Sequence, residues 1–201
     1  YKADLLDKRL FVELALFDIR WDKLQQPIAV GATTLTGNAG KAGSRGAELA
    51  LRYQLDDHFS LDGSLAYTDA KLKEDAPALA ASGARLPNSA RLSTMLGGRY
   101  SYELAGKPAY LGVTVRQVGA RNAGFDSPTT SIPNFRMPGY MLVDLQAGVD
   151  INGWELGAYV RNLADKRALS GADTALTAFG GPLRVTPVQP RTFGMNLARA
   201  F

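Results

Sequence analysis

The segment RTFGMNLARAF, residues 191–201, decides the fold class because its side chains alternate with a period of two. Phe193, Met195, Leu197 and Phe201 share one parity, and small or polar residues occupy most of the other. Such alternation is typical of a strand with one apolar face. In a soluble sandwich that face packs on a core. In a transmembrane β-barrel it faces lipid, and the opposite face lines the lumen.

The same alternation recurs along the 201 residues and predicts an all-β, antiparallel protein. Each predicted strand has one apolar face and one face of small, polar or charged residues. We expect about nine strands, the first of them a short stub, at residues 1–5, 10–25, 47–55, 59–72, 91–102, 110–121, 140–150, 154–162 and 191–201.

Composition excludes several other classes of protein. No run of eighteen apolar residues is present, so a transmembrane helix is excluded. The net charge of +4 is spread along the chain without a basic stripe, so no nucleic-acid partner is expected. The chain has no cysteine and a single histidine, His58, which we interpret as part of a solvated turn. We therefore expect no metal site and no cofactor, and no spacing of nucleophile and base indicates an enzyme.

The connections between the predicted strands alternate in length. They are short after residues 5, 55, 102 and 150, and long after residues 72, 121 and 162. A sandwich with one solvated face per sheet reproduces the side-chain alternation, but outer-membrane barrels also have short periplasmic turns and long extracellular loops. The loop asymmetry therefore favours a transmembrane barrel.

The strand at residues 10–25 changes parity along its length. Its apolar residues are even-numbered from Leu10 to Leu16, and odd-numbered from Phe17 to Trp21. This change predicts either a β-bulge near Leu16 or a rim where both faces are covered. Trp21 suits an aromatic girdle at the membrane interface, and the alternative is a half-buried tryptophan of a soluble sheet.

Nine strands do not fit a complete bacterial barrel, because single-chain barrels have even strand numbers. An open sheet with two bare edges and a lipid-facing surface would not be stable alone. We therefore expect these residues to be the C-terminal part of a longer barrel.

Seven segments resemble the C-terminal barrel of TonB-dependent outer-membrane receptors, and they occur in that family's order. They are FDIRWDKLQ at 17–25, NAGKAGSRGAELAL at 38–51, LAYTDAKL at 65–72, LPNSARLS at 86–93, MPGYMLVDLQAGV at 137–149, VRNLADKR at 160–167 and QPRTFGMNLARAF at 189–201. Two residues depart from the family pattern. Ala164 stands where an aromatic residue is common, and Arg199 stands at an outward apolar position from which an arginine can snorkel.

The resemblance implies a 22-stranded barrel in the outer membrane of a Gram-negative bacterium, in which residues 1–201 are the C-terminal barrel segment. The plug domain, the TonB box and the N-terminal strands would lie upstream. It further implies import of a scarce small-molecule ligand such as a ferric siderophore. The expected partners are outer-membrane lipid, the TonB complex through the missing N-terminal part, and the barrel-assembly machinery, which would read Phe201. A carbohydrate or other nutrient receptor and a self-contained structural barrel are the alternatives.

Two groups of residues are candidates for function. The first is the set of charged residues predicted to face the lumen, where they would hold the plug or present charge to a ligand: Glu48, Arg52, Arg91, Arg99, Arg116, Asp144 and Arg161. The second lies at or in the long loops at 73–88, 122–138 and 163–190, and offers cationic and aromatic surface for ligand contact: Arg121, Asn122, Phe125 and Phe135. The FRMP segment at 135–138 is similar to a haem-receptor loop motif, but we interpret it as structural.

Overall fold

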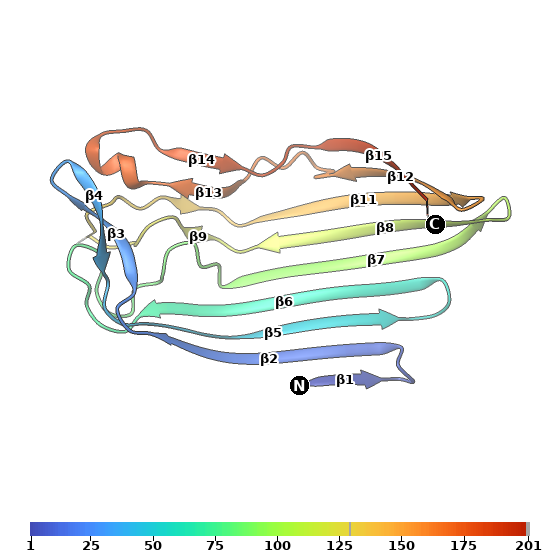
Figure 1. The fold of residues 1–201 in the computed structure, drawn as a ribbon, viewed down its shortest axis with the longest axis horizontal. Coiled ribbons are helices and arrows are strands. Elements are labelled where there is room, and N and C mark those ends of the chain that lie inside the picture. The colour runs from blue at the N-terminus through green and yellow to red at the C-terminus, as the bar shows by residue number, and fades with distance from the viewer. Residues whose placement is uncertain (129, 200–201) are drawn as a thin grey trace.

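The computed structural model describes residues 1–128 and 130–199, and its body is one antiparallel sheet (Figure 1). The strand order is β1-β2-β5-β6-β7-β8-β11-β12-β15, so the all-β, nine-stranded prediction is confirmed. The bounds of these strands are β1 Lys2–Leu5, β2 Leu10–Trp21, β5 Ala42–Gln54, β6 Phe59–Leu72, β7 Leu92–Leu104, β8 Lys107–Val118, β11 Tyr140–Ile151, β12 Trp154–Arg161 and β15 Thr192–Arg199.

Short turns join the strands at one end of the sheet. Two of them have left-handed φ angles at both central residues, 51° and 70° at Ala105 and Gly106, and 56° and 82° at Asn152 and Gly153. These angles are those of type I′ hairpin turns, whose twist matches the flanking strands. The short connection predicted after residue 150 is therefore present.

Long connections fill the opposite end and contain additional structure (Figure 1). Three small two-stranded sheets form there, together with one 3₁₀ helix. Their bounds are β3 Gln25–Val30 with β4 Thr33–Asn38, β9 Arg121–Asn122 with β10 Arg136–Met137, β13 Leu169–Asp173 with β14 Arg184–Pro187, and η1 Ala175–Phe179. The sequence predicts a short polar, glycine-bearing link where the β3–β4 hairpin lies, and Pro27 interrupts the strand pattern of β3. In consequence β2 ends earlier, and β5 begins earlier, than predicted.

The pairing register divides the sheet into two faces. Residues directly opposite each other on neighbouring strands point to the same face. One row across the sheet is almost entirely apolar: Leu10, Tyr53, Leu61, Gly98, Val113, Leu145, Val160 and Phe193. The adjacent row on the other face is mostly polar: Phe11, Arg52, Asp62, Gly97, Thr114 and Asp144.

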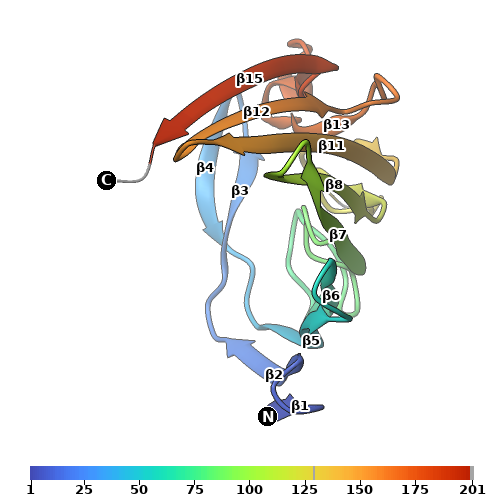
Figure 2. The same cartoon turned by 90° about the vertical axis from the view of Figure 1, so that its right-hand side faces the viewer.

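The polar face is the concave one. Ala42 and Leu72 lie on the polar side of β5 and β6, and Ile28 of β3 packs against the buried cluster that contains them. The β3–β4 hairpin lies on the concave side of the curved sheet (Figure 2). The apolar face is therefore convex, and its side chains are exposed, as shown by Leu16 at 76% and Met195 at 83%. A contiguous exposed apolar face of this kind marks a membrane or interaction surface rather than the core of a sandwich.

The parity change in β2 arises without a bulge. The pairing of β2 with β5 runs unbroken from Leu10 opposite Tyr53 to Trp21 opposite Ala42. The bulge prediction is therefore wrong, and so is the prediction of a rim with both faces covered, because residues 18–21 are exposed in the described chain. Trp21 shares the concave face with buried Ala42 and is 36% exposed, so it does not belong to a lipid-facing girdle.

A small hydrophobic core lies beneath the long connections. Its buried members are Ala39, Ala42, Leu72, Ala76, Leu79, Ala80 and Phe125, with Leu24, Ile28, Ala84 and Leu86 packed around them. The cluster joins the β3–β4 hairpin to the loops after β6 and β9 and holds them together. In the described part of the chain, no helix has the length and apolar character needed to cross a membrane.

Candidate functional site

A polar groove on the concave face collects three of the residues predicted to face the lumen. Arg116 donates to Asp144 Oδ2 at 2.6 Å, and Asp144 Oδ1 accepts the Asn162 backbone N–H at 2.8 Å. The Arg161 guanidinium lies 4.9 Å from the centre of the Tyr159 ring. The groove has a volume of about 460 Å³ and is also lined by Thr114, Gln146 and Gln189. Its size is within the range of small-molecule sites.

A second polar cluster ties three strands together nearer the short turns. The Arg99 guanidinium of β7 lies 3.5 Å from the centre of the Tyr110 ring of β8. The Tyr110 hydroxyl donates to Glu155 Oε1 of β12 at 3.0 Å. This cation–π contact and hydrogen bond fix the side chain of Arg99 against the wall. Tyr110 and Glu155 share the polar parity of their strands, but the sequence does not indicate their contact, because they are 45 residues apart.

The other predicted wall residues lie apart from these clusters. Glu48 lines a second groove of about 470 Å³ over β5 to β8, which Arg116 of the first groove also borders. Arg52 pairs across the strands with Asp62, and Arg91 precedes β7 with an exposed side chain. The structure thus distributes the seven charged residues over the wall instead of gathering them at one point.

Glycines on the concave face lie opposite large polar side chains that cover them. A Cβ atom added at Gly148 would collide with the Tyr110 ring, and one at Gly194 would collide with the Tyr159 ring. Each of these glycines pairs directly with the residue that covers it, as do three more pairs: Gly97 with Asp62, Gly112 with Gln146, and Gly157 with Asn196. These pairs let the polar side chains lie flat along the wall.

The four loop candidates have structural contacts of their own. Phe125 is 3% exposed in the loop core, and Arg121 is 9% exposed. Arg121 Nη2 donates to Ser170 O at 2.6 Å, while its Nη1 has no hydrogen-bond partner among the described residues. The Asn122 carbonyl accepts the Asn88 N–H at 2.7 Å, and the Phe135 carbonyl accepts the Ala123 N–H at 2.9 Å. The ligand contacts predicted for these four residues stay a prediction.

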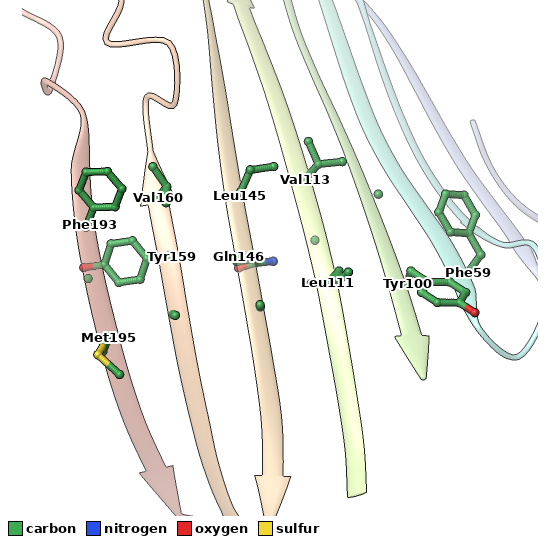
Figure 3. A pocket seen from close by; sticks show the side chains of 15 residues that line it. Phe59, Tyr100, Leu111, Val113, Leu145, Gln146, Tyr159, Val160, Phe193 and Met195 are labelled. Atoms are coloured by element: carbon green, nitrogen blue, oxygen red, sulfur yellow. The ribbon is translucent and has the colours of Figure 1, made fainter. Parts of the chain in front are cut away.

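The convex face carries a broad apolar hollow of about 880 Å³ (Figure 3). Leu145, Val113 and Phe193 are among the side chains that line it, and no charged residue contributes to the lining. A site that recognises a polar ligand needs polar groups at fixed positions. We therefore assign this hollow to the apolar face as a whole and not to a specific ligand.

The family model of the TonB dependent receptor-like β-barrel matches residues 1–163. The chain belongs to this family. Its convex face is accordingly the lipid-facing surface of an outer-membrane β-barrel, and its concave face is lumenal. The family consists of transport receptors rather than enzymes. In such receptor barrels the short turns are periplasmic and the long loops are extracellular.

Known relatives resemble this chain over 98% of its length. The metal-pseudopaline receptor CntO of Pseudomonas aeruginosa is 32% identical over 98% of this chain, which covers 26% of that relative. The siderophore receptor PiuA of Acinetobacter baumannii has a TM-score of 0.73 at 20% identity, over 98% of this chain and 26% of its own. The ferric-catecholate import receptor Fiu of E. coli K12 has a TM-score of 0.72 at 22% identity, with the same coverage.

Two residues noted in the sequence, Arg199 and His58, lie at the periplasmic end of the receptor barrel. The Arg199 guanidinium lies 5.1 Å from the Trp154 ring, its direct neighbour on the convex face. His58 lies in a turn, where its backbone N–H donates to Asp56 Oδ1 at 2.8 Å. Two such backbone donors, from His58 and Phe59, lower the pKa of Asp56. The assembly signal predicted at Phe201 lies outside the described residues.

The VRNLADKR segment joins β12 to β15 at the extracellular end. Asn162 is 2% exposed, and its Nδ2 donates to Lys166 O at 3.1 Å and to Gln189 O at 2.9 Å. Its Oδ1 accepts the Lys166 N–H at 2.8 Å. Asp165 Oδ1 accepts the Arg191 N–H at 3.0 Å, and this bond is the main cause that lowers the pKa of Asp165. The segment closes the base of the longest loop.

Proposed function

We propose that this chain forms the C-terminal barrel segment of an outer-membrane receptor that imports a scarce small ligand, such as a ferric siderophore, with energy delivered through TonB. In this proposal the plug, the TonB box and the N-terminal strands lie upstream of residue 1. The chain spans 26% of the curated relative, whose name describes it as a metal-pseudopaline receptor.

The observation that carries the proposal is the lumenal groove in which Arg116 and Arg161 flank Asp144. Asp144 neutralises one of the two arginines, so a cation remains to meet an anionic group of a ligand or of the plug. The groove lies at the extracellular half of the wall, because Asn162 of the β12–β15 junction hydrogen bonds to its carboxylate.

Uptake measurements with the complete receptor test the proposal. A strain that lacks the gene should lose uptake of radioactive iron supplied as a ferric siderophore, and the native gene should restore it. Uptake should stop when the proton gradient is collapsed, because TonB draws on it. Uptake that is unaffected by deletion of the receptor would contradict the proposal, and loss of growth on a carbohydrate instead would favour the nutrient alternative.

The groove itself is tested by Arg116→Gln combined with Arg161→Gln. Loss of charge-assisted hydrogen bonds should reduce uptake about tenfold or more at unchanged receptor abundance. Lys8→Gln, in a periplasmic turn, is the control and should leave uptake unchanged. If the receptor that carries both arginine substitutions transports the ligand as well as the native receptor and the Lys8→Gln control do, the groove has no part in uptake.

A further inference from the structure

The convex face changes from apolar to charged at the extracellular ends of β2, β5 and β6. The last apolar row across these strands is Leu16, Ala47 and Tyr67. The next row on the same face, about 7 Å farther along the strands, is Asp18, Arg45 and Asp69. Charged side chains therefore begin on the lipid-facing side directly beyond the apolar band, at the depth of the lipid headgroups.

Cations outnumber anions in this region. Asp69 is surrounded by three of them, with Lys71 Nζ at 3.0 Å, Arg85 Nη2 at 3.3 Å and Arg45 Nε at 3.9 Å from its oxygens. One carboxylate cannot neutralise three cations, so positive charge remains. Arg45 also keeps 70% of its side chain exposed and is available to another anion.

A groove of about 490 Å³ lies among these charged side chains. Its charged lining consists of Arg20, Lys41, Arg45 and Lys73 together with Asp18 and Asp22. Gly43 forms its floor, because the Lys73 side chain crosses the space that a Cβ at Gly43 would need, with Cε 2.7 Å away. Lys73 has no ion-pair partner among the described residues.

The positive charge is uneven around the described barrel wall. At the corresponding ends of β8 and β11 the convex positions are uncharged residues, namely Gln117 and Met141. Cations recur at the β12–β15 junction, where Arg191 directly precedes β15. At β2, β5 and β6, however, the cations line a groove that can hold an anionic group.

We propose that this cationic groove binds a phosphate group in the headgroup of an anionic glycolipid of the outer leaflet. The acyl chains of that lipid lie on the apolar rows below, while Arg45, Lys73 and their neighbours contact the phosphate. Basic residues beside a membrane attract anionic headgroups by about 1 kcal/mol each, a fivefold effect on affinity. The inference rests on the outer-membrane location of the barrel and is independent of the cargo.

Binding of diphosphorylated lipid A to the purified complete receptor in neutral detergent tests this proposal. Arg45→Gln combined with Lys73→Gln should weaken binding about thirtyfold, from two headgroup contacts. Lys73→Gln alone, which breaks no ion pair within the described chain, should weaken it about fivefold. The matched control is Lys8→Gln combined with Lys107→Gln, which removes two cations at the periplasmic end and should change the affinity less than twofold.

Dephosphorylated lipid A separates headgroup recognition from acyl-chain contact. It should bind the native receptor and the groove variant with the same low affinity. Equal loss of affinity in the groove and control variants, or native affinity for the dephosphorylated lipid, would overturn the proposal. Heat-modifiable migration of each variant on gels shows that its barrel has formed, so a folding failure cannot imitate lost binding.

Discussion

The two faces of the same nine strands are suited to different environments. On the concave face, polar side chains contact one another or lie over glycines, as Arg116 does with Asp144 and Tyr110 with Gly148. On the convex face, apolar side chains stay exposed over the whole width of the sheet. Adjacent residues of one strand therefore meet different solvents. We therefore expect the stability change caused by a substitution to depend more on whether the side chain points to the convex or the concave face than on its distance along the strand.

The largest expected effect is that of a charge placed on the lipid-facing side in mid-strand. Leu145→Arg should destabilise the receptor by about 2–4 kcal/mol, because the guanidinium enters the centre of the bilayer. Gln146→Arg, at the adjacent lumenal position, should cost less than about 1 kcal/mol, since that face is polar. Urea unfolding of the complete receptor in lipid vesicles measures both, and equal costs would contradict the assignment of the faces.

Asn162 directly follows β12 and is 2% exposed, and a polar residue is tolerated there because its amide is fully hydrogen-bonded. Asn162→Ala should destabilise the receptor by about 2–3 kcal/mol, because it leaves buried backbone groups without partners. It should also raise the rate of proteolysis within the 163–190 loop. Asn196→Ala, on the lumenal face, serves as the comparison. If Asn196→Ala is as costly, burial of the Asn162 amide is not the cause.

Replacing a glycine by alanine should cost more stability on the concave face than on the convex face. Gly148→Ala should cost about 1–2 kcal/mol, because the new Cβ displaces the Tyr110 ring from its hydrogen bond to Glu155. Gly98→Ala faces lipid, where the nearest side-chain atom to a Cβ would be 3.5 Å away, and should be nearly neutral. The same unfolding assay compares the two variants, and a neutral Gly148→Ala would show that the ring moves aside freely.

The smallest effect concerns pH. The Arg191 N–H, followed by the charge of Arg167, lowers the pKa of Asp165 below its ordinary value of 3.8. A folded-state pKa below the unfolded value means that the carboxylate stabilises the fold above the ordinary pKa, and that this contribution disappears as pH falls through the lowered one. Asp165→Asn should therefore unfold more easily than the native receptor at neutral pH and equally easily in strong acid. A difference that persists in strong acid would contradict this account.

Alternation and loop length were sufficient to predict the sheet, its nine strands and the orientation of its faces. They did not reveal the β3–β4 hairpin, where Pro27 interrupts the strand pattern. The parity change after Leu16 also had two explanations from sequence. Only the unbroken pairing with β5 shows that β2 passes from a lipid-facing band to a rim where its apolar side chains turn inward.

The candidate site was predicted residue by residue but not as a set of contacts. Parity placed Arg116, Asp144 and Arg161 on one face, and the structure brings them into one groove with Tyr159. The contact of Arg99 with Tyr110 and Glu155 depends on pairing between strands distant in sequence, which alternation alone does not encode. Arg121 and Phe125 are buried under neighbouring loops, and no periodic pattern reports burial within loops.

Solvent accessibility along β11 tests the central claim most directly. The 201 residues contain no cysteine. In the complete receptor, with cysteines outside these residues replaced by serine, single cysteines at positions 141 to 146 can carry nitroxide labels in lipid vesicles. We predict that labels at 141, 143 and 145 collide with oxygen dissolved in the bilayer, and that labels at 142, 144 and 146 collide with a water-soluble nickel chelate or are shielded by the plug. The opposite phase, or odd positions protected from both reagents as in the core of a sandwich, would contradict the account.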